Sequence, residues 1–71
     1  MNIEYNKGDD VIITSLDEDL EDMYNEIGIK EGTIMNIEGI KIEDGKIYFK
    51  LKKKNGEATI WNTHCSFRKV K

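Results

Sequence analysis

The side chains best suited to nucleophilic chemistry in this chain are His64 and Cys65, which are neighbours in the sequence. A thiol nucleophile needs a base within hydrogen-bond reach, whereas successive side chains of an extended segment point to opposite sides. One cysteine and one histidine are also too few for a structural zinc site, which needs four ligands. We therefore expect Cys65 to be a small buried apolar side chain and His64 to lie at the surface or in a turn. We predict no enzymatic activity, no metal and no cofactor.

Carboxylates are concentrated in one segment, which has six acidic side chains and no basic one between residues 17 and 26. They are Asp17, Glu18, Asp19, Glu21, Asp22 and Glu26. A calcium loop of the EF-hand type needs glycine at its sixth position and glutamate at its twelfth, but counting from Asp17 these positions hold Asp22 and Gly28. Calcium binding is therefore not expected. Two interpretations remain: a solvated helix face, or an acidic docking face for a basic partner, which would include mimicry of nucleic-acid charge.

The net charge of −3 hides a split between the two parts of the chain. Residues 1–45 carry thirteen Asp and Glu against three Lys, a net charge of −10, and residues 46–71 carry eight Lys and Arg against Glu57, a net charge of +7. Such asymmetry is typical of proteins with two faces of different potential. The alternative is that acidic and basic segments pack side by side and screen one another.

The length and composition are those of one small domain. A chain of 71 residues is too short for two cores, so we expect a polar N-terminal tail over residues 1–7 and one domain over residues 8–71. The single cysteine excludes an intrachain disulfide, and no stretch approaches the roughly 20 apolar residues of a membrane span. We therefore expect a cytoplasmic protein. Abundant Ile, Lys, Asn, Asp and Glu, with one Ala, one Arg and no Pro, indicate AT-rich codons and so a low-GC bacterium, its phage or a mobile element.

The first half of the chain changes its periodicity after a short strand predicted at 11–14. Apolar residues then recur at the spacing of an amphipathic helix. The stripe consists of Leu16, Leu20, Met23 and Ile27, with Tyr24 beside it. Ser15 and Glu18 fit a capping box, and Gly28 can end a helix in the left-handed conformation. We predict a helix over residues 16–27, the alternative being an irregular loop with one turn of helix.

Two dipeptides, Asp44-Gly45 and Asn55-Gly56, predict tight hairpins of the type I′ class. Two-residue loops determine which residues face one another. Around the first, the pairs are Glu43–Lys46, Ile42–Ile47, Lys41–Tyr48 and Ile40–Phe49. Around the second, they are Lys54–Glu57, Lys53–Ala58, Lys52–Thr59, Leu51–Ile60 and Lys50–Trp61. Both registers place apolar residues on one face, where Lys53 is the exception. A short 3₁₀ or irregular turn within residues 62–66 and a last strand at 67–70 complete the chain.

The order of these elements resembles the SH3-like small barrel. Within that group, Gly8-Asp9-Asp10-Val11-Ile12-Ile13 followed by Gly28-Ile29-Lys30-Glu31-Gly32-Thr33-Ile34 resembles small bacterial barrel proteins and the KOW-type modules of translation and transcription factors. The resemblance covers residues 8–70. It implies a mostly β fold, an SH3-like five-stranded small barrel with a short acidic helix in the first long connection, and a protein that binds partners.

The hairpin registers also assign one set of side chains to the face opposite the core. These are Lys41, Tyr48, Lys50, Lys52, Thr59 and Trp61. Tyr and Trp anchor protein interfaces, and aromatic rings beside lysines also suit a stack of nucleobases and their phosphates. We therefore expect a non-enzymatic, protein-binding module, monomeric or weakly dimeric; the alternative is an RNA- or DNA-binding module. A further alternative is that the helix or the tail, through Tyr5, covers Trp61 as a second small core.

Overall fold

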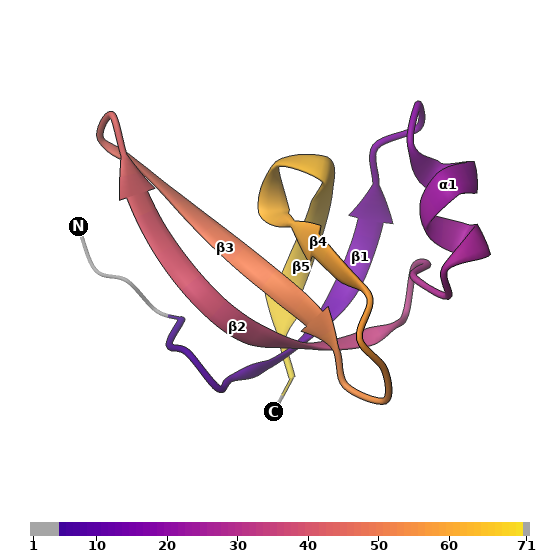
Figure 1. The fold of residues 1–71 in the computed structure, drawn as a ribbon, viewed down its shortest axis with the longest axis horizontal. Coiled ribbons are helices and arrows are strands. Elements are labelled where there is room, and N and C mark those ends of the chain that lie inside the picture. Colours follow the sequence, from indigo (N-terminus) through magenta and orange to yellow (C-terminus); the bar gives the residue numbers. More distant parts are fainter. Residues whose placement is uncertain (1–4, 71) are drawn as a thin grey trace.

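Five antiparallel strands form one sheet in the order β4-β3-β2-β1-β5, seen in a computed structural model that describes residues 5–70 (Figure 1). The strands are β1 (Asp10–Leu16), β2 (Ile34–Glu43), β3 (Lys46–Lys53), β4 (Thr59–Trp61) and β5 (Cys65–Lys69). A short helix, α1 (Glu21–Glu26), follows β1, and a 3₁₀ turn, η1 (Asn62–His64), joins β4 to β5. The predicted mostly β architecture and the short helix in the first long connection are therefore confirmed. Within the described residues, no helix has the length and apolar character needed to cross a bilayer.

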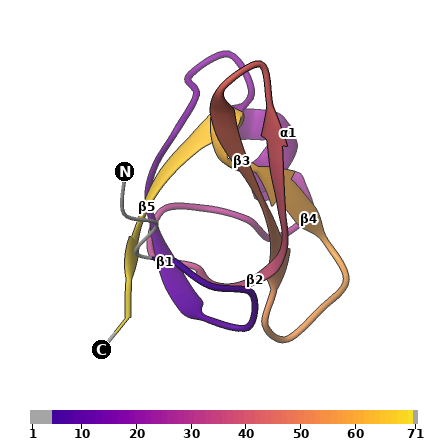
Figure 2. The same ribbon diagram turned by 90° about the vertical axis from the view of Figure 1, so that its left-hand side faces the viewer.

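The sheet is strongly bent, with β1 and β5 on one side and β3 and β4 on the other (Figure 2). Two bulges accompany the bend: the register shifts between Ile13 and Ser15 in β1 and between Ile37 and Gly39 in β2. A bulge bends and twists its strand because one residue is left without a partner. Strands β4 and β5 are the two edges of the sheet and are not neighbours in it, so the sheet is not closed into a barrel.

The hairpin at Asp44-Gly45 forms as predicted. Both residues have positive φ, 52° at Asp44 and 76° at Gly45, which is the requirement of a type I′ turn. All four predicted pairs, from Glu43–Lys46 to Ile40–Phe49, are present. A two-residue turn thus sets the register of the longest strand pair in the molecule.

The hairpin at Asn55-Gly56 has the predicted register but a different turn. The pairs Lys50–Trp61, Leu51–Ile60 and Lys52–Thr59 form. The type I′ prediction is wrong, because neither Asn55 nor Gly56 has positive φ. The cause is Lys54: its N–H donates to the Ile34 carbonyl (3.3 Å) and its ammonium pairs with Asp10 (2.6 Å). These contacts take Lys54 out of the predicted pair with Glu57.

The helix is shorter than the predicted range 16–27, and the predicted capping box is wrong. Ser15 and Leu16 continue β1, where they pair with Ser66 and Cys65. The chain turns at Asp17 instead: its Oδ1 accepts the Asp19 N–H at 3.0 Å and its carbonyl accepts the Leu20 N–H at 2.9 Å. An Asp side chain that binds the backbone two residues later is a common turn former. The extra pairing with β5 therefore extends the strand and delays the helix to Glu21.

The C-terminal end of α1 forms as the sequence predicted, with Gly28 in the left-handed conformation. Gly28 has φ +85°, its N–H donates to the Asn25 carbonyl, and the Ile29 N–H donates to the Tyr24 carbonyl. This pair of bonds is the Schellman motif. A Cβ at Gly28 would also collide with the ammonium of Lys53. The half-buried side chain of Lys53 therefore reaches from the core face of the sheet to the end of α1.

The core lies on the concave side of the sheet and is closed at one end by α1. Its buried side chains are Val11, Ile13, Tyr24, Ile29, Met35, Ile37, Phe49, Leu51 and Ile60. The hairpin between β2 and β3 projects beyond this core, so Ile42 is 67% exposed although it lies on the predicted apolar face. At the other end, η1 confirms the predicted 3₁₀ turn, while β5 begins at Cys65 rather than at residue 67.

Candidate binding surface on strands β2, β3 and β4

Six residues predicted as a binding surface lie together on one side of the β2–β3–β4 sheet. We call this set the aromatic–lysine face: Lys41, Tyr48, Lys50, Lys52, Thr59 and Trp61. Lys41 pairs across the sheet with Tyr48, Lys50 with Trp61, and Lys52 with Thr59. Tyr48, Lys50 and Trp61 are half-buried and the other members are exposed. The register alone therefore brings residues from three strands into one surface.

Lys41 joins the two aromatic rings of this face. Its ammonium nitrogen lies 5.5 Å from the centroid of the Tyr48 ring and 5.1 Å from that of the Trp61 ring. Both distances are within the range in which a cation is attracted to a ring face. The same nitrogen is 3.2 Å from the Glu43 carboxylate. The rings, the cation and the carboxylate thus form one continuous polar and aromatic surface.

The backbone of Trp61 is held by contacts around η1. The next side chain, Asn62, accepts the Phe49 N–H at 3.0 Å through Oδ1, which continues the hydrogen bonding between β3 and this segment where β4 ends. The Trp61 carbonyl lies 3.9 Å from the Cys65 thiol, which donates to it. Trp61 is therefore positioned by a short strand that is fixed at its C-terminal end.

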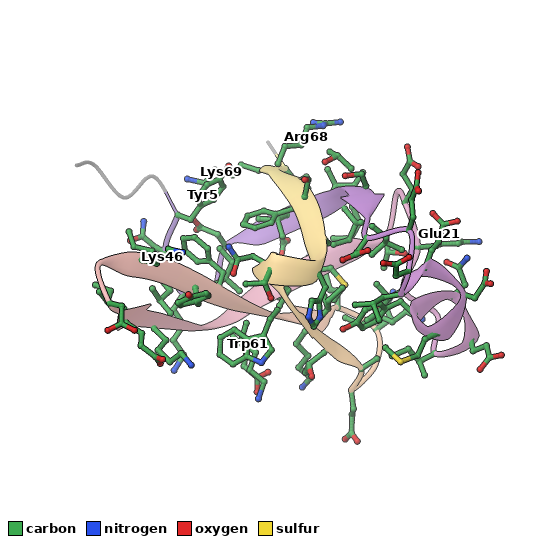
Figure 3. The ribbon with its side chains drawn as sticks, turned by 90° about the horizontal axis from the view of Figure 1, so that it is seen from above. Tyr5, Glu21, Lys46, Trp61, Arg68 and Lys69 are labelled. Atoms are coloured by element: carbon green, nitrogen blue, oxygen red, sulfur yellow. The ribbon has the colours of Figure 1, made fainter. Side chains whose placement is uncertain are left out.

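Tyr5 does not cover Trp61. Its ring packs against Phe49 and Phe67, with centroids 5.6 and 5.1 Å away, and these two rings lie 5.8 Å from each other. Figure 3 shows Tyr5 and Trp61 on opposite sides of the β2–β3 ribbon. The three rings extend the core instead, and the alternative of a second core built from Tyr5 and Trp61 is wrong.

The predicted acidic docking face lies on α1 and the turn before it, and all six of its carboxylates are exposed. Within residues 5–70, none of them forms an ion pair, and neither does Lys50 or Lys52. The acidic and basic parts of the chain do meet at β1, where Asp10 pairs with Lys54 and Asp9 lies 3.4 Å from the Lys69 ammonium. Both interpretations of the charge split are therefore partly right: Asp9, Asp10 and Lys41 have partners of opposite charge, whereas the carboxylates of the acidic docking face, Lys50 and Lys52 form no ion pair within residues 5–70.

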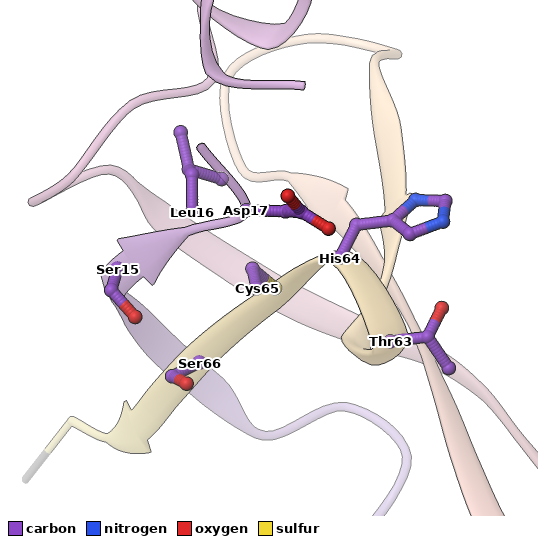
Figure 4. A pocket seen from close by; sticks show the side chains of 7 residues that line it. All are labelled: Ser15, Leu16, Asp17, Thr63, His64, Cys65 and Ser66. Carbon is purple, nitrogen blue, oxygen red and sulfur yellow. The ribbon is translucent and has the colours of Figure 1, made fainter. Parts of the chain in front are cut away.

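His64 and Cys65 line a polar depression of about 270 Å³ where β1 meets η1 and β5 (Figure 4). Its lining consists of Ser15, Leu16, Asp17, Thr63, His64, Cys65 and Ser66. A hydrogen bond of 2.8 Å joins His64 Nδ1 to the Tyr24 hydroxyl. Burial raises the pKa of the Cys65 thiol to about 11, which disfavours the thiolate that nucleophilic attack requires. His64 and Cys65 therefore make contacts within the fold, His64 with the Tyr24 hydroxyl and Cys65 with the Trp61 carbonyl.

Two features of the surface escaped the sequence patterns. Met23 and Ile27 were expected on the buried stripe of the helix, yet they are 51% and 49% exposed, while Tyr24 is buried. The Tyr24–His64 bond also joins residues 40 positions apart, for which the sequence carries no signal. Comparison of the chain with protein-family profiles, with curated proteins and with solved structures finds no match.

Proposed function

We propose that this chain is a non-enzymatic interaction module that binds a protein partner through the aromatic–lysine face. The observation that carries the proposal is the position of Lys41, whose ammonium lies over both Tyr48 and Trp61. Trp and Tyr are enriched among the residues that contribute most of the binding energy at protein interfaces. The face also lies on strands rather than on loops, so a partner would meet it already ordered.

The proposed architecture is an SH3-like small barrel. The sheet order β4-β3-β2-β1-β5, the long connection after β1 and the 3₁₀ turn before β5 support it. In this chain the strongly bent sheet has its hydrophobic core on one side, is open between β4 and β5, and carries the aromatic–lysine face on the other side of β2–β3–β4. The barrel and the binding surface are thus parts of one proposal.

A protein partner suits this face better than a nucleic acid. The Glu43 carboxylate beside Lys41 repels phosphate. The feature that favours nucleic acid is the pair Lys50 and Lys52, which form no ion pair within residues 5–70, so RNA or DNA binding is the second candidate.

The experiment is a selection of random peptides displayed on phage against the wild-type protein, with counter-selection against a Tyr48→Ala/Trp61→Ala variant. Enrichment of related peptides that bind the wild type and lose at least about tenfold in affinity for the variant would support the proposal. An Ile42→Ala variant, changed at an exposed residue outside the face, serves as the matched control and should bind normally. Circular dichroism establishes that each variant is folded.

Labelled single- and double-stranded oligonucleotides are titrated in parallel by fluorescence anisotropy. If nucleic acid is the ligand, the affinity falls steeply as salt is raised, because lysine–phosphate contacts release counterions, and Lys50→Gln/Lys52→Gln reduces the salt dependence. Peptide selection without enrichment, together with salt-dependent oligonucleotide binding, would replace protein by nucleic acid as the partner. Absence of both kinds of binding would overturn the aromatic–lysine face as a binding surface.

A further inference from the structure

The exposed side of α1 presents an apolar pair beside carboxylates. Met23 and Ile27 are four residues apart and therefore lie on the same side of the helix, with exposed fractions of 51% and 49%. Tyr24 is buried in the core, whereas about half of each member of this pair is accessible. Asp22 and Glu26 each precede a member of the pair and so lie along one flank of it, and within residues 5–70 neither carboxylate forms an ion pair.

The complementary surface is present on the same chain. The aromatic–lysine face offers rings for apolar side chains, and it carries Lys50 and Lys52 without ion pairs within residues 5–70. A methionine sulfur makes favourable contacts with aromatic rings. Apolar side chains beside carboxylates on one surface therefore match aromatic rings beside lysines on the other, in both charge and chemistry.

These two surfaces cannot meet within one molecule. Figure 3 shows Glu21, on α1, well separated from Trp61, and α1 is attached at the end of the core by the buried Tyr24 and its bond to His64. Contact between the two surfaces therefore needs a second copy of the chain.

We propose that the chain self-associates head to tail, with Met23 and Ile27 of one copy seated on the aromatic–lysine face of the next. The proposal rests on the proposed function, because it names a partner for that same face. The contact is heterologous, since two different surfaces meet. Each copy carries one surface of each kind, so repetition of the contact gives a ring if the rotation from one copy to the next closes and an open chain if it does not.

The interface is small. A stable complex buries about 800 Å² on each partner, which would be roughly a sixth of the 5025 Å² accessible surface of this chain. Two exposed apolar side chains and a few charges cover less than that. The association is therefore weak, and it strengthens at low ionic strength because exposed charge pairs are screened by salt.

The test measures weight-average mass by sedimentation as a function of protein concentration and salt. For the wild type we expect a mass that rises above the 8.2 kDa of the monomer as concentration increases at low salt and returns toward it at high salt. Two charge-reversal variants, Asp22→Lys/Glu26→Lys and Lys50→Glu/Lys52→Glu, should each remain monomeric. Mixed together they should associate again, because the unchanged face of the first variant fits the unchanged helix of the second, and the two reversed surfaces are also opposite in charge.

Three controls separate this contact from general charge effects. Glu31→Lys and Lys7→Glu change exposed residues outside both surfaces and should self-associate like the wild type. Met23→Ser/Ile27→Ser keeps every charge and should lose association. Circular dichroism establishes folding for all variants.

A monomeric wild type at low salt and high concentration, or a mixture of the two reversal variants that stays monomeric, would overturn self-association. That result leaves the proposed function intact if peptide selection still enriches ligands that need Tyr48 and Trp61. If the peptides also fail, both proposals are wrong.

Discussion

Single side chains in this protein have their acidity set by their immediate partners. The pKa of the Asp10 carboxyl is lowered, first by the hydrogen bond from the Lys54 ammonium and then by that from the Asn36 amide. The Cys65 thiol shows the opposite effect, since burial raises its pKa to about 11 from an ordinary value of 9.0. A group whose pKa is raised by folding stabilises the native state below its unfolded pKa, and this contribution is lost as the pH rises.

The thiol of Cys65 should therefore react slowly until the solution is strongly alkaline. At pH 8, a pKa of about 11 instead of 9.0 means about a hundredfold less thiolate. We expect the rate of alkylation by iodoacetamide to rise with a midpoint near pH 11 in the native protein and near pH 9 in denaturant. A native midpoint near 9 would contradict the burial effect even if the native rate is slower at every pH, because a uniformly slow rate with an unshifted midpoint reports restricted access alone.

The helix α1 owes its place to tertiary contacts. Six residues are too few for a helix to be stable in isolation, and its N-terminal residue Leu20 makes no side-chain capping bond. Its anchors are the buried ring of Tyr24, the hydrogen bond from that residue to His64, and the Schellman motif at Gly28. One side chain thus connects this helix to η1 and to the core.

Removing the Tyr24 hydroxyl should loosen α1 without disturbing the core. We expect Tyr24→Phe to lower the free energy of unfolding by about 1 kcal/mol, because His64 Nδ1 loses its partner at a partly buried position. Met23→Ala is the matched control on the exposed side of the helix and should change stability by less than about 0.5 kcal/mol. Urea denaturation measures both, and equal effects of the two substitutions would show that the hydrogen bond contributes nothing.

At the scale of the whole molecule, the sheet is open between its edge strands and aromatic packing extends the core. Tyr5, Phe49 and Phe67 come from the N-terminal segment, β3 and β5, and their rings meet edge to face. The Gly8 N–H also donates to the Ile37 carbonyl, so the segment before β1 is tied to the bulged part of β2. The segment over residues 5–9 therefore contributes to the fold.

Tyr5→Ala should destabilise the whole domain. The substitution removes two aromatic contacts of about 0.5–1.5 kcal/mol each, in addition to apolar burial, so we expect a loss of about 2 kcal/mol in the free energy of unfolding. Tyr5→Phe keeps the ring and should remain within about 0.5 kcal/mol of the wild type. Thermal denaturation measures the difference, and an alanine variant as stable as the wild type would mean that the aromatic cluster is dispensable.

Local chemistry determined much of this protein from its sequence. Asp44-Gly45 admits positive φ at both positions, so the turn and the register of β2 against β3 follow from two residues, and with them the common face of Lys41 and Tyr48. The second hairpin register, the left-handed Gly28 and the 3₁₀ turn at η1 follow in the same way. The pairing of β2 with β3, that of β3 with β4 and the composition of the aromatic–lysine face were therefore predictable, because each depends on interactions between residues close in sequence.

The tertiary structure decided the conformation wherever a residue distant in the sequence competes with the local conformational preference of the chain. Ser15 belongs to a strand because Ser66 pairs with it. Asn55 does not adopt the type I′ turn because its neighbour Lys54 binds Ile34 and Asp10. Tyr24, and not Met23, lies in the core because His64 accommodates the Tyr24 hydroxyl. In each case the deciding interaction joins residues far apart in the chain. A helical or hairpin pattern read over a few residues carries no information about such contacts, so the exposed side of α1 became visible only in the folded molecule.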